Sequence, residues 1–332
     1  MGCFFRSNSI SANTQHIRSK ETTVENRMLL LTVLAGGFFM AWAHPSDAKL
    51  NVIASTPDLA AIAREVGGDR ADVTSLAKGT EDPHFVDPKP SFIRILNQAD
   101  ALIEGGADLE IGWLPPLVLN ARNPKIHLGQ PGRIVAAEVV RLLEVPTGPI
   151  DRSMGDVHPF GNPHFTLDPL NGKLIAERIK ERLCVLSAAD CPLFTTNAKQ
   201  VEDKIDSRLA LWQKQMAPLR GTKVVTYHRS YSYLAERFGL QVLNTIEPKP
   251  GIPPSASHAR DLITQMKAEG VKLILMEPNR ERKTPAFLAQ QTGARVVMIP
   301  SMVGGSKEAG DYLALFDHIV KTLLMDAGQQ LP

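Results

Sequence analysis

The stretch "PLFTTNAKQVEDKIDSRLALWQKQMAPLRG", from Pro192 to Gly221, decides how this chain is organised. Apolar residues recur in it every three or four positions, which is the spacing of one face of an α-helix. These residues are Val201, Ile205, Leu209 and Trp212. Neither glycine nor proline interrupts the pattern before Pro218, so it predicts about 25 residues of continuous helix, roughly 38 Å long. A helix of this length predicts a stiff connection between two lobes.

Short β-branched runs alternate with helical patterns on both sides of this stretch, which is typical of parallel βαβ units. The strand-like runs before it are "LNVIAST", "ADVTSLA", "DALIEGG" and "PKIHLG", and those after it are "TKVVTY", "LQVLNTI", "VKLILMEP" and "ARVVMIP". We therefore expect an α/β fold of two Rossmann-like lobes with parallel sheets, joined by a long backbone helix. The expected parts are a leader at 1–48, an N-terminal lobe at 49–190, the connecting helix at 191–217 and a C-terminal lobe at 218–332.

The composition fits a soluble globular protein. The 332 residues are 43% hydrophobic and 22% charged, and the chain is long enough for two lobes with cores of their own. The formal net charge is only +2, and acidic and basic residues are interspersed. Without a Lys/Arg-rich run or a basic-aromatic stripe, we expect no nucleic-acid partner.

The N-terminus carries the features of a secretory signal. The stretch "MLLLTVLAGGFFMAWAHPSDA", from Met28 to Ala48, follows Arg27 and contains an apolar run of about 15 residues. It offers two small-x-small cleavage sites, ending at Ala43 and Ala48. The apolar run is short for a membrane span. We therefore expect export to the periplasm or the medium, with Met1 or Met28 as the initiator.

The cysteines agree with export. Cys3 would be lost with the leader, which leaves Cys184 and Cys191 in "RLCVLSAADCPLF". An even pair in an oxidising compartment can close a small loop at a turn between two helices. We therefore predict a disulfide between these two residues.

Three histidines fall in loops where a ligand site is expected. His84 in "TEDPHFVDP" and His164 in "FGNPHFTLDP" share the tripeptide Pro-His-Phe, and His228 in "VTYHRSY" directly follows a strand. Ligands bind outside the carboxyl ends of strands in open parallel sheets. Neutral imidazole is a common zinc ligand and suits Zn²⁺ better than the harder Mn²⁺. The three residues predict a zinc site, with Mn²⁺ as the alternative.

These motifs resemble those of the cluster A-I zinc/manganese-type periplasmic solute-binding proteins of ABC transporters. "DPHFVDPKPS" matches the Asp-Pro-His motif of that family, "GNPHFTLDP" its Asn-Pro-His-aromatic motif, and "YHRSYSYLAERFGL" its third ligand segment. The resemblance covers roughly residues 50–326 and keeps the order of the family's motifs. It implies a monomer that binds a divalent metal between its lobes through His84, His164 and His228. It also implies delivery of the metal to a membrane permease that works with a cytoplasmic ATPase.

One position departs from the family pattern. The fourth ligand of the family is usually an Asp shortly after the last strand, where this chain has Ser301 in "VVMIPSMVGG". The fourth position is then left to water, to Glu277 at the end of "LILME", or to His158 in "GDVHPFGNPH". Ser301 itself is the remaining candidate, although a neutral hydroxyl is a poor ligand beside a carboxylate.

Other functions remain open beside zinc import. A manganese- or iron-type binding protein would use the same fold, and an organic-solute binder would have a cleft rich in Trp and Arg. Trp113 and Trp212, however, fall in helical patterns. A secreted zinc hydrolase could use three histidines and a water, but the chain has neither a His-Glu-x-x-His helix nor a Gly-x-Ser-x-Gly elbow. We therefore expect a binding protein rather than an enzyme.

Overall fold

The computed structural model describes residues 48–148, 155 and 157–328. The predicted leader, apart from Ala48, lies outside the described residues. Within the described ranges, no helix combines the length and the apolar character needed to cross a bilayer.

The first lobe is built on a sheet of four parallel strands. They are β1 (Leu50–Ala54), β2 (Ala71–Ser75), β3 (Ala101–Glu104) and β4 (Arg133–Val135), in the order β2-β1-β3-β4. The strand order reverses between β1 and β3, and the crevice at such a point is where α/β sheets bind ligands.

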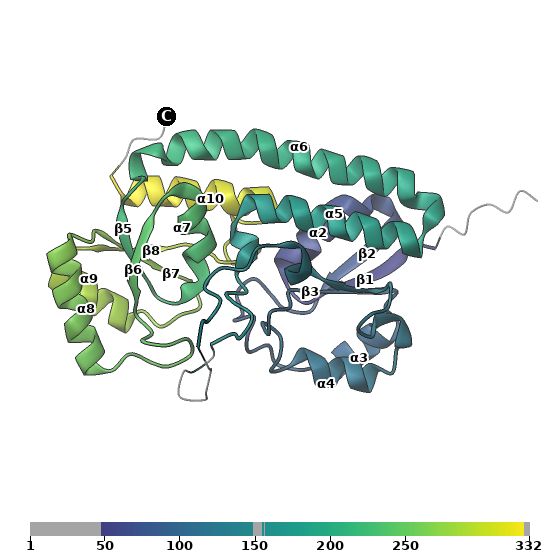
Figure 1. Ribbon diagram of the computed structural model, residues 1–332, viewed down its shortest axis with the longest axis horizontal. Helices are drawn as coiled ribbons and strands as arrows, with labels where there is room; N and C mark the ends of the chain where they lie inside the picture. Colours follow the sequence, from purple (N-terminus) through teal and green to yellow (C-terminus); the bar gives the residue numbers. More distant parts are fainter. Residues whose placement is uncertain (1–47, 149–154, 156, 329–332) are drawn as a thin grey trace, which may run out of the picture. The chain divides into compact units, whose positions relative to one another are not determined.

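The second lobe repeats this arrangement. Its strands are β5 (Lys223–Thr226), β6 (Gln241–Thr245), β7 (Leu273–Met276) and β8 (Arg295–Met298), in the order β6-β5-β7-β8. All pairs are parallel, and the order reverses between β5 and β7. The prediction of two α/β lobes with parallel sheets is confirmed (Figure 1).

Nine α-helices in the described part of the chain cover the sheets. They are α2 (Pro57–Gly67), α3 (Pro90–Asn97), α4 (Leu114–Ala121), α5 (Pro169–Leu186), α6 (Cys191–Met216), α7 (Ser232–Phe238), α8 (Ala256–Glu269), α9 (Lys283–Thr292) and α10 (Tyr312–Asp326). Helices α2, α3 and α5 begin at a proline, whose fixed φ suits the first helical turn and whose missing N–H is not needed there.

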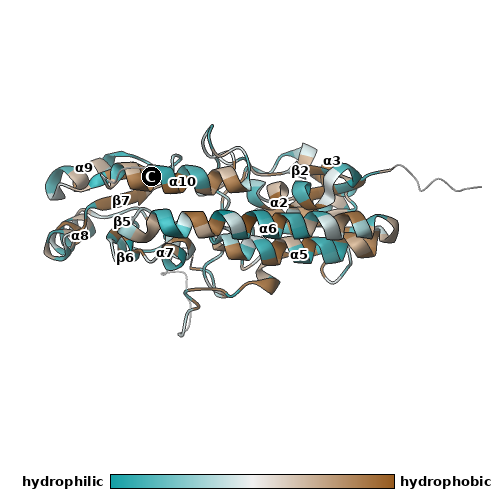
Figure 2. Ribbon diagram, turned by 90° about the horizontal axis from the view of Figure 1, so that it is seen from above, coloured by the Kyte–Doolittle hydropathy of each residue, from teal (hydrophilic) through white to brown (hydrophobic). Residues whose placement is uncertain are grey.

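Helix α6 is the predicted long helix, and its 26 residues join the two lobes. It packs on α2 and α5 of the first lobe and on α10 of the second, and Figure 2 shows α5 and α6 side by side. Its buried face, which includes Ile205 and Trp212, belongs to one hydrophobic cluster with residues of both lobes. Trp212 is fully buried near Phe316, and its Nε1 donates to Asp317 Oδ1 at 2.8 Å. The helix is therefore part of both cores.

The strand predicted for "PKIHLG" is wrong. Pro124–Ile126 forms a 3₁₀ turn, and the fourth strand, β4, comes several residues later. Asn123 fixes the turn, because its Oδ1 accepts from Lys125 N at 3.1 Å and its Nδ2 donates to the Leu96 and Ala99 carbonyls. An Asn-Pro pair is a turn signal that outweighs a short apolar run.

The predicted disulfide is present. Cys184 in the last turn of α5 is bonded to Cys191 at the start of α6, so the bond closes the turn between the two helices.

Replacing Cys184 and Cys191 together by serine should lower the free energy of unfolding by about 2–3 kcal/mol, because the bond restricts a short loop in the unfolded chain. Urea unfolding of the metal-free protein, followed by circular dichroism, measures the change. Native protein treated with a reductant is the control and should unfold at the same urea concentration as the variant. Equal midpoints for the oxidised native protein and the variant would contradict the prediction.

Candidate metal centre

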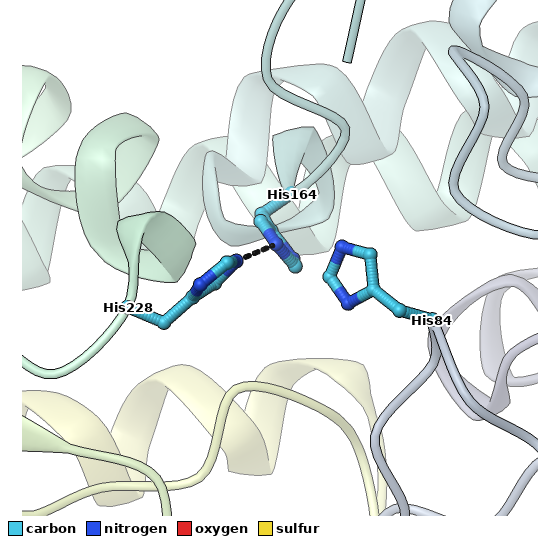
Figure 3. A group of neighbouring side chains, drawn as sticks. All are labelled: His84, His164 and His228. Carbon is cyan, nitrogen blue, oxygen red and sulfur yellow. Dashed lines mark hydrogen bonds between the residues drawn. The ribbon is translucent and has the colours of Figure 1, made fainter. Parts of the chain in front are cut away.

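The structure brings the three predicted histidines together. His84 lies in the loop after β2, His164 precedes the 3₁₀ turn Phe165–Leu167 that leads into α5, and His228 follows β5. All three are buried or nearly so, and their ligand nitrogens lie within 4.8 Å of one another (Figure 3). His164 Nε2 lies 3.2 Å from His228 Nε2.

The shared Pro-His-Phe tripeptide has a structural reason. Asp82 Oδ1 accepts a hydrogen bond from His84 N at 3.0 Å, and Asn162 Oδ1 accepts one from His164 N at 2.9 Å. Each motif is therefore an Asx turn, in which the side chain of one residue bonds the backbone two residues later. The proline between them restricts the local backbone. Both histidines are thus presented by the same local structure.

Two carboxylates orient two of the imidazoles. Asp82 Oδ1 lies 2.7 Å from His84 Nδ1, and Glu247 Oε2 lies 2.7 Å from His228 Nδ1. An ionised carboxylate can only accept, so each ring carries its proton on Nδ1 and keeps the lone pair of Nε2 free. A carboxylate partner of this kind is usual for histidines that bind metals. The sequence reasoning missed both residues.

Burial keeps the remaining ring neutral. Burial and the neighbouring His84 and His228 hold the pKa of His164 well below its ordinary value. The pKa of His158 falls to about 4, chiefly through burial and then through His84. A neutral imidazole is the form that binds a metal ion, so these rings need not lose a proton at neutral pH.

Three carboxyl groups surround a single arginine behind the histidines. Arg280 Nη1 is 3.1 Å from Asp82 Oδ2 and 3.5 Å from Glu247 Oε1, and Arg280 Nε is 3.9 Å from Glu277 Oε2. Burial alone would raise the pKa of Asp82 and Glu247, but the bonded histidines and Arg280 lower both. With all three carboxyls ionised and the imidazoles neutral, the formal charge is −2. Buried charge of this kind needs a counterion, and a divalent cation would balance it.

The three residues that are candidates for a fourth ligand differ in position. Among the described residues, the group whose ligand atoms all lie within 4.8 Å contains the three histidines and none of the candidates. His158 approaches the group at His84, where the two Nε2 atoms lie 3.1 Å apart. Glu277 is buried beside Arg280, and neither of its carboxylate oxygens has a hydrogen-bond partner. Ser301 lines a small cavity together with His164.

The cavities beside the histidines are smaller than most sites for organic ligands, and the larger of them, about 160 Å³, is lined by His84 and His158 among other residues. A cavity of about 40 Å³ is lined by His158, His164 and His228, among other residues. Sites for organic ligands usually occupy about 300–1,000 Å³, whereas a single water needs about 10–15 Å³ on this measure. The 40 Å³ cavity has room for an ion or a few waters.

Two α/β lobes joined by one long helix, with a group of histidines contributed by both lobes, define a bilobal solute-binding protein of the metal type. The chain belongs to the family described as "Zinc-uptake complex component A periplasmic", which matches residues 52–325. The resemblance found in the sequence motifs is thereby confirmed.

Individual relatives are distant. The zinc-binding lipoprotein AdcA of Streptococcus pneumoniae is 25% identical over 317 residues, which cover 92% of this chain and 61% of the lipoprotein. The iron-binding protein YfeA of Yersinia pestis is 24% identical over 302 residues, 87% of this chain and 91% of that protein. The crystal structure of ZnuA has the same fold, with a TM-score of 0.70 at 21% identity, over 84% of this chain and 99% of that one.

Proposed function

We propose that this protein captures a divalent transition metal, most favourably Zn²⁺, outside the cytoplasm and delivers it to an ABC permease for import. The observation that carries the proposal is the buried group of His84, His164 and His228, which come from both lobes. Family membership supports it, as do a relative named for zinc and another named for iron. Capture and delivery need no catalytic residue. The permease, its ATPase and a monomeric state are parts of the proposal, and so are the lobe boundaries at 49–190, 191–217 and 218–332.

We assign the fourth ligand to His158. In a tetrahedral site with Zn–N distances of about 2.0–2.1 Å, neighbouring nitrogens are about 3.3–3.4 Å apart. The Nε2 atoms of His164 and His228 are 3.2 Å apart, and those of His84 and His158 are 3.1 Å apart. Both distances are close to edges of such a tetrahedron, and because His158 lies outside the group within 4.8 Å, its ring must move toward His164 and His228 to complete the site.

Native mass spectrometry combined with metal analysis tests the proposal on the purified, exported protein. We expect one divalent transition-metal ion per chain, removable by a chelator and restored by one equivalent of Zn²⁺. A protein that retains no metal and takes up none would contradict the function. A co-purifying organic molecule bound one to one would instead favour an organic-solute binder.

Ser301→Asp should strengthen Mn²⁺ binding more than Zn²⁺ binding. An added carboxylate beside His164 supplies the oxygen ligand that Mn²⁺ prefers, while imidazole already satisfies zinc. We expect the Mn²⁺ dissociation constant to fall on the order of tenfold, from the added charge. Titration calorimetry with both metals measures it, and Ser301→Asn is the neutral control of equal size. Equal changes for the two metals would show that position 301 does not reach the ion.

A further inference from the structure

Arg280 connects the two halves of the histidine group through their carboxylate partners. It follows β7 in the second lobe, and its Nη1 contacts both Asp82 of the first lobe and Glu247 of the second. Each carboxylate gives one oxygen to its histidine and the other to Arg280. A single guanidinium nitrogen therefore joins two carboxylate–histidine pairs that belong to different lobes.

The surroundings of Arg280 make its charge effective. Its side chain is 18% exposed, against 19% for Asp82 and 7% for Glu247, so solvent and salt screen these contacts less than they screen surface ion pairs. The guanidinium carbon also lies 5.7 Å from the centre of the Tyr227 ring, within cation–π range. Without Arg280, the two carboxylates would repel each other across the lobes.

We propose that Arg280 is a positioning residue that holds the two lobes together over the bound ion and keeps His84 and His228 directed at it. The inference rests on the proposed metal-binding function. Arg280 acts through Asp82 and Glu247 and is not itself a ligand. Other contacts join the lobes as well, since Asp58 Oδ1 accepts a hydrogen bond from Val303 N at 2.6 Å. Loss of Arg280 therefore speeds release of the ion and does not abolish binding.

A competing effect has the opposite sign. Arg280 carries a positive charge near the site of a cation, so it also repels the ion. If repulsion were its only effect, removing Arg280 would slow dissociation of the metal. If it holds the lobes together, removing it speeds dissociation. The direction of the change in dissociation rate therefore separates the two roles.

The test uses Arg280→Met, which removes the charge and keeps an unbranched side chain. Zinc-loaded protein is mixed with excess chelator, and release is followed by stopped-flow fluorescence. We expect release about tenfold faster than from the native protein, equivalent to about 1.4 kcal/mol. Arg280→Lys keeps a charge and should give an intermediate rate. Arg282→Met, a change at an exposed arginine before α9, is the matched control and should release zinc at the native rate.

Distances between the lobes give a second measurement. Spin labels on unnatural amino acids at Leu119 of α4 and Phe287 of α9, both exposed, leave the disulfide untouched. Metal-free Arg280→Met should show longer distances than the native protein, and Arg280→Lys distances close to native ones. Thermal unfolding of the metal-free variants checks that each is folded.

Two results would overturn the proposal: native or slower zinc release from Arg280→Met, or unchanged distances between the labels. Either result in a native protein that binds one zinc ion contradicts only the role of Arg280. A native protein that takes up no zinc contradicts the proposed function itself. The two failures are therefore distinguishable in one set of measurements.

Discussion

Replacing His84, His164 and His228 together by alanine is expected to abolish the rise in Tm that zinc produces in the native protein. A ligand that binds only the folded state stabilises it by about 2.7 kcal/mol at a free concentration of 100 times Kd. Because the three imidazoles supply most of the proposed ligands, the variant keeps no site of comparable affinity. Differential scanning calorimetry with zinc and with a chelator measures the shift.

The matched control is a variant in which His127 and His318 are replaced by alanine. His127 is exposed after the 3₁₀ turn at Pro124–Ile126, and His318 is half-buried in α10. This variant removes imidazoles without touching the group and should keep the native zinc shift. A full zinc-dependent shift in the triple variant would place the metal elsewhere and overturn the assignment of His84, His164 and His228.

The sequence predicted the fold well because the fold depends on local periodicity. The three- and four-residue spacing around Ile205 and Trp212 specifies one face of α6, and that face is buried along both lobes. The alternation of strands and helices along the chain indicates parallel sheets. The error at Pro124–Ile126 arose where a side chain, Asn123, bonds carbonyls far away in the sequence. Such bonds have no periodic signature.

The sequence located the histidines but not the residues that orient them. His228 was found because it follows a strand, and Glu247 follows the neighbouring strand β6 in the same way. Applying the strand-end rule to acidic residues would have proposed Glu247. Asp82 belongs to the same motif as His84 and accepts from the His84 backbone N–H. That it also bonds Nδ1 of the His84 ring depends on the direction of the ring, which only the structure shows. No sequence pattern pointed to Arg280, because its partners Asp82 and Glu247 belong to different lobes and lie far from it in the sequence.

Acidic residues surround the histidines without belonging to the group of close ligand atoms. Asp82, Glu247 and Glu277 place negative charge around the histidines, and Arg280 offsets part of it. Asp82 and Glu247 hold their charge behind the imidazoles, on the Nδ1 side of each ring. Zinc binding should therefore depend on the carboxylates as strongly as on a ligand.

Glu247→Gln is expected to weaken zinc binding about 10- to 100-fold, the usual cost of losing a carboxylate that orients a metal-bound histidine. The amide keeps the size of the side chain but removes the charge that favours a proton on His228 Nδ1, so the ring is less firmly held with Nε2 toward the ion. Competition with a fluorescent chelator measures the affinity. Asp82→Asn should behave alike, since Asp82 serves His84 in the same way.

Glu236→Gln is the control for the loss of a carboxylate at a distance. Glu236 is half-exposed in α7 and paired with Arg141, so its removal leaves both carboxylate–histidine pairs intact. If zinc affinity depended only on the net charge of the protein, all three variants would weaken binding equally and only slightly. If it depends on the orientation of the imidazoles, Glu247→Gln and Asp82→Asn should weaken binding strongly while Glu236→Gln stays native. An affinity of Glu247→Gln within twofold of native would mean that the backbone alone, through the turns at His84 and His164 and the strand end at His228, suffices to direct the rings.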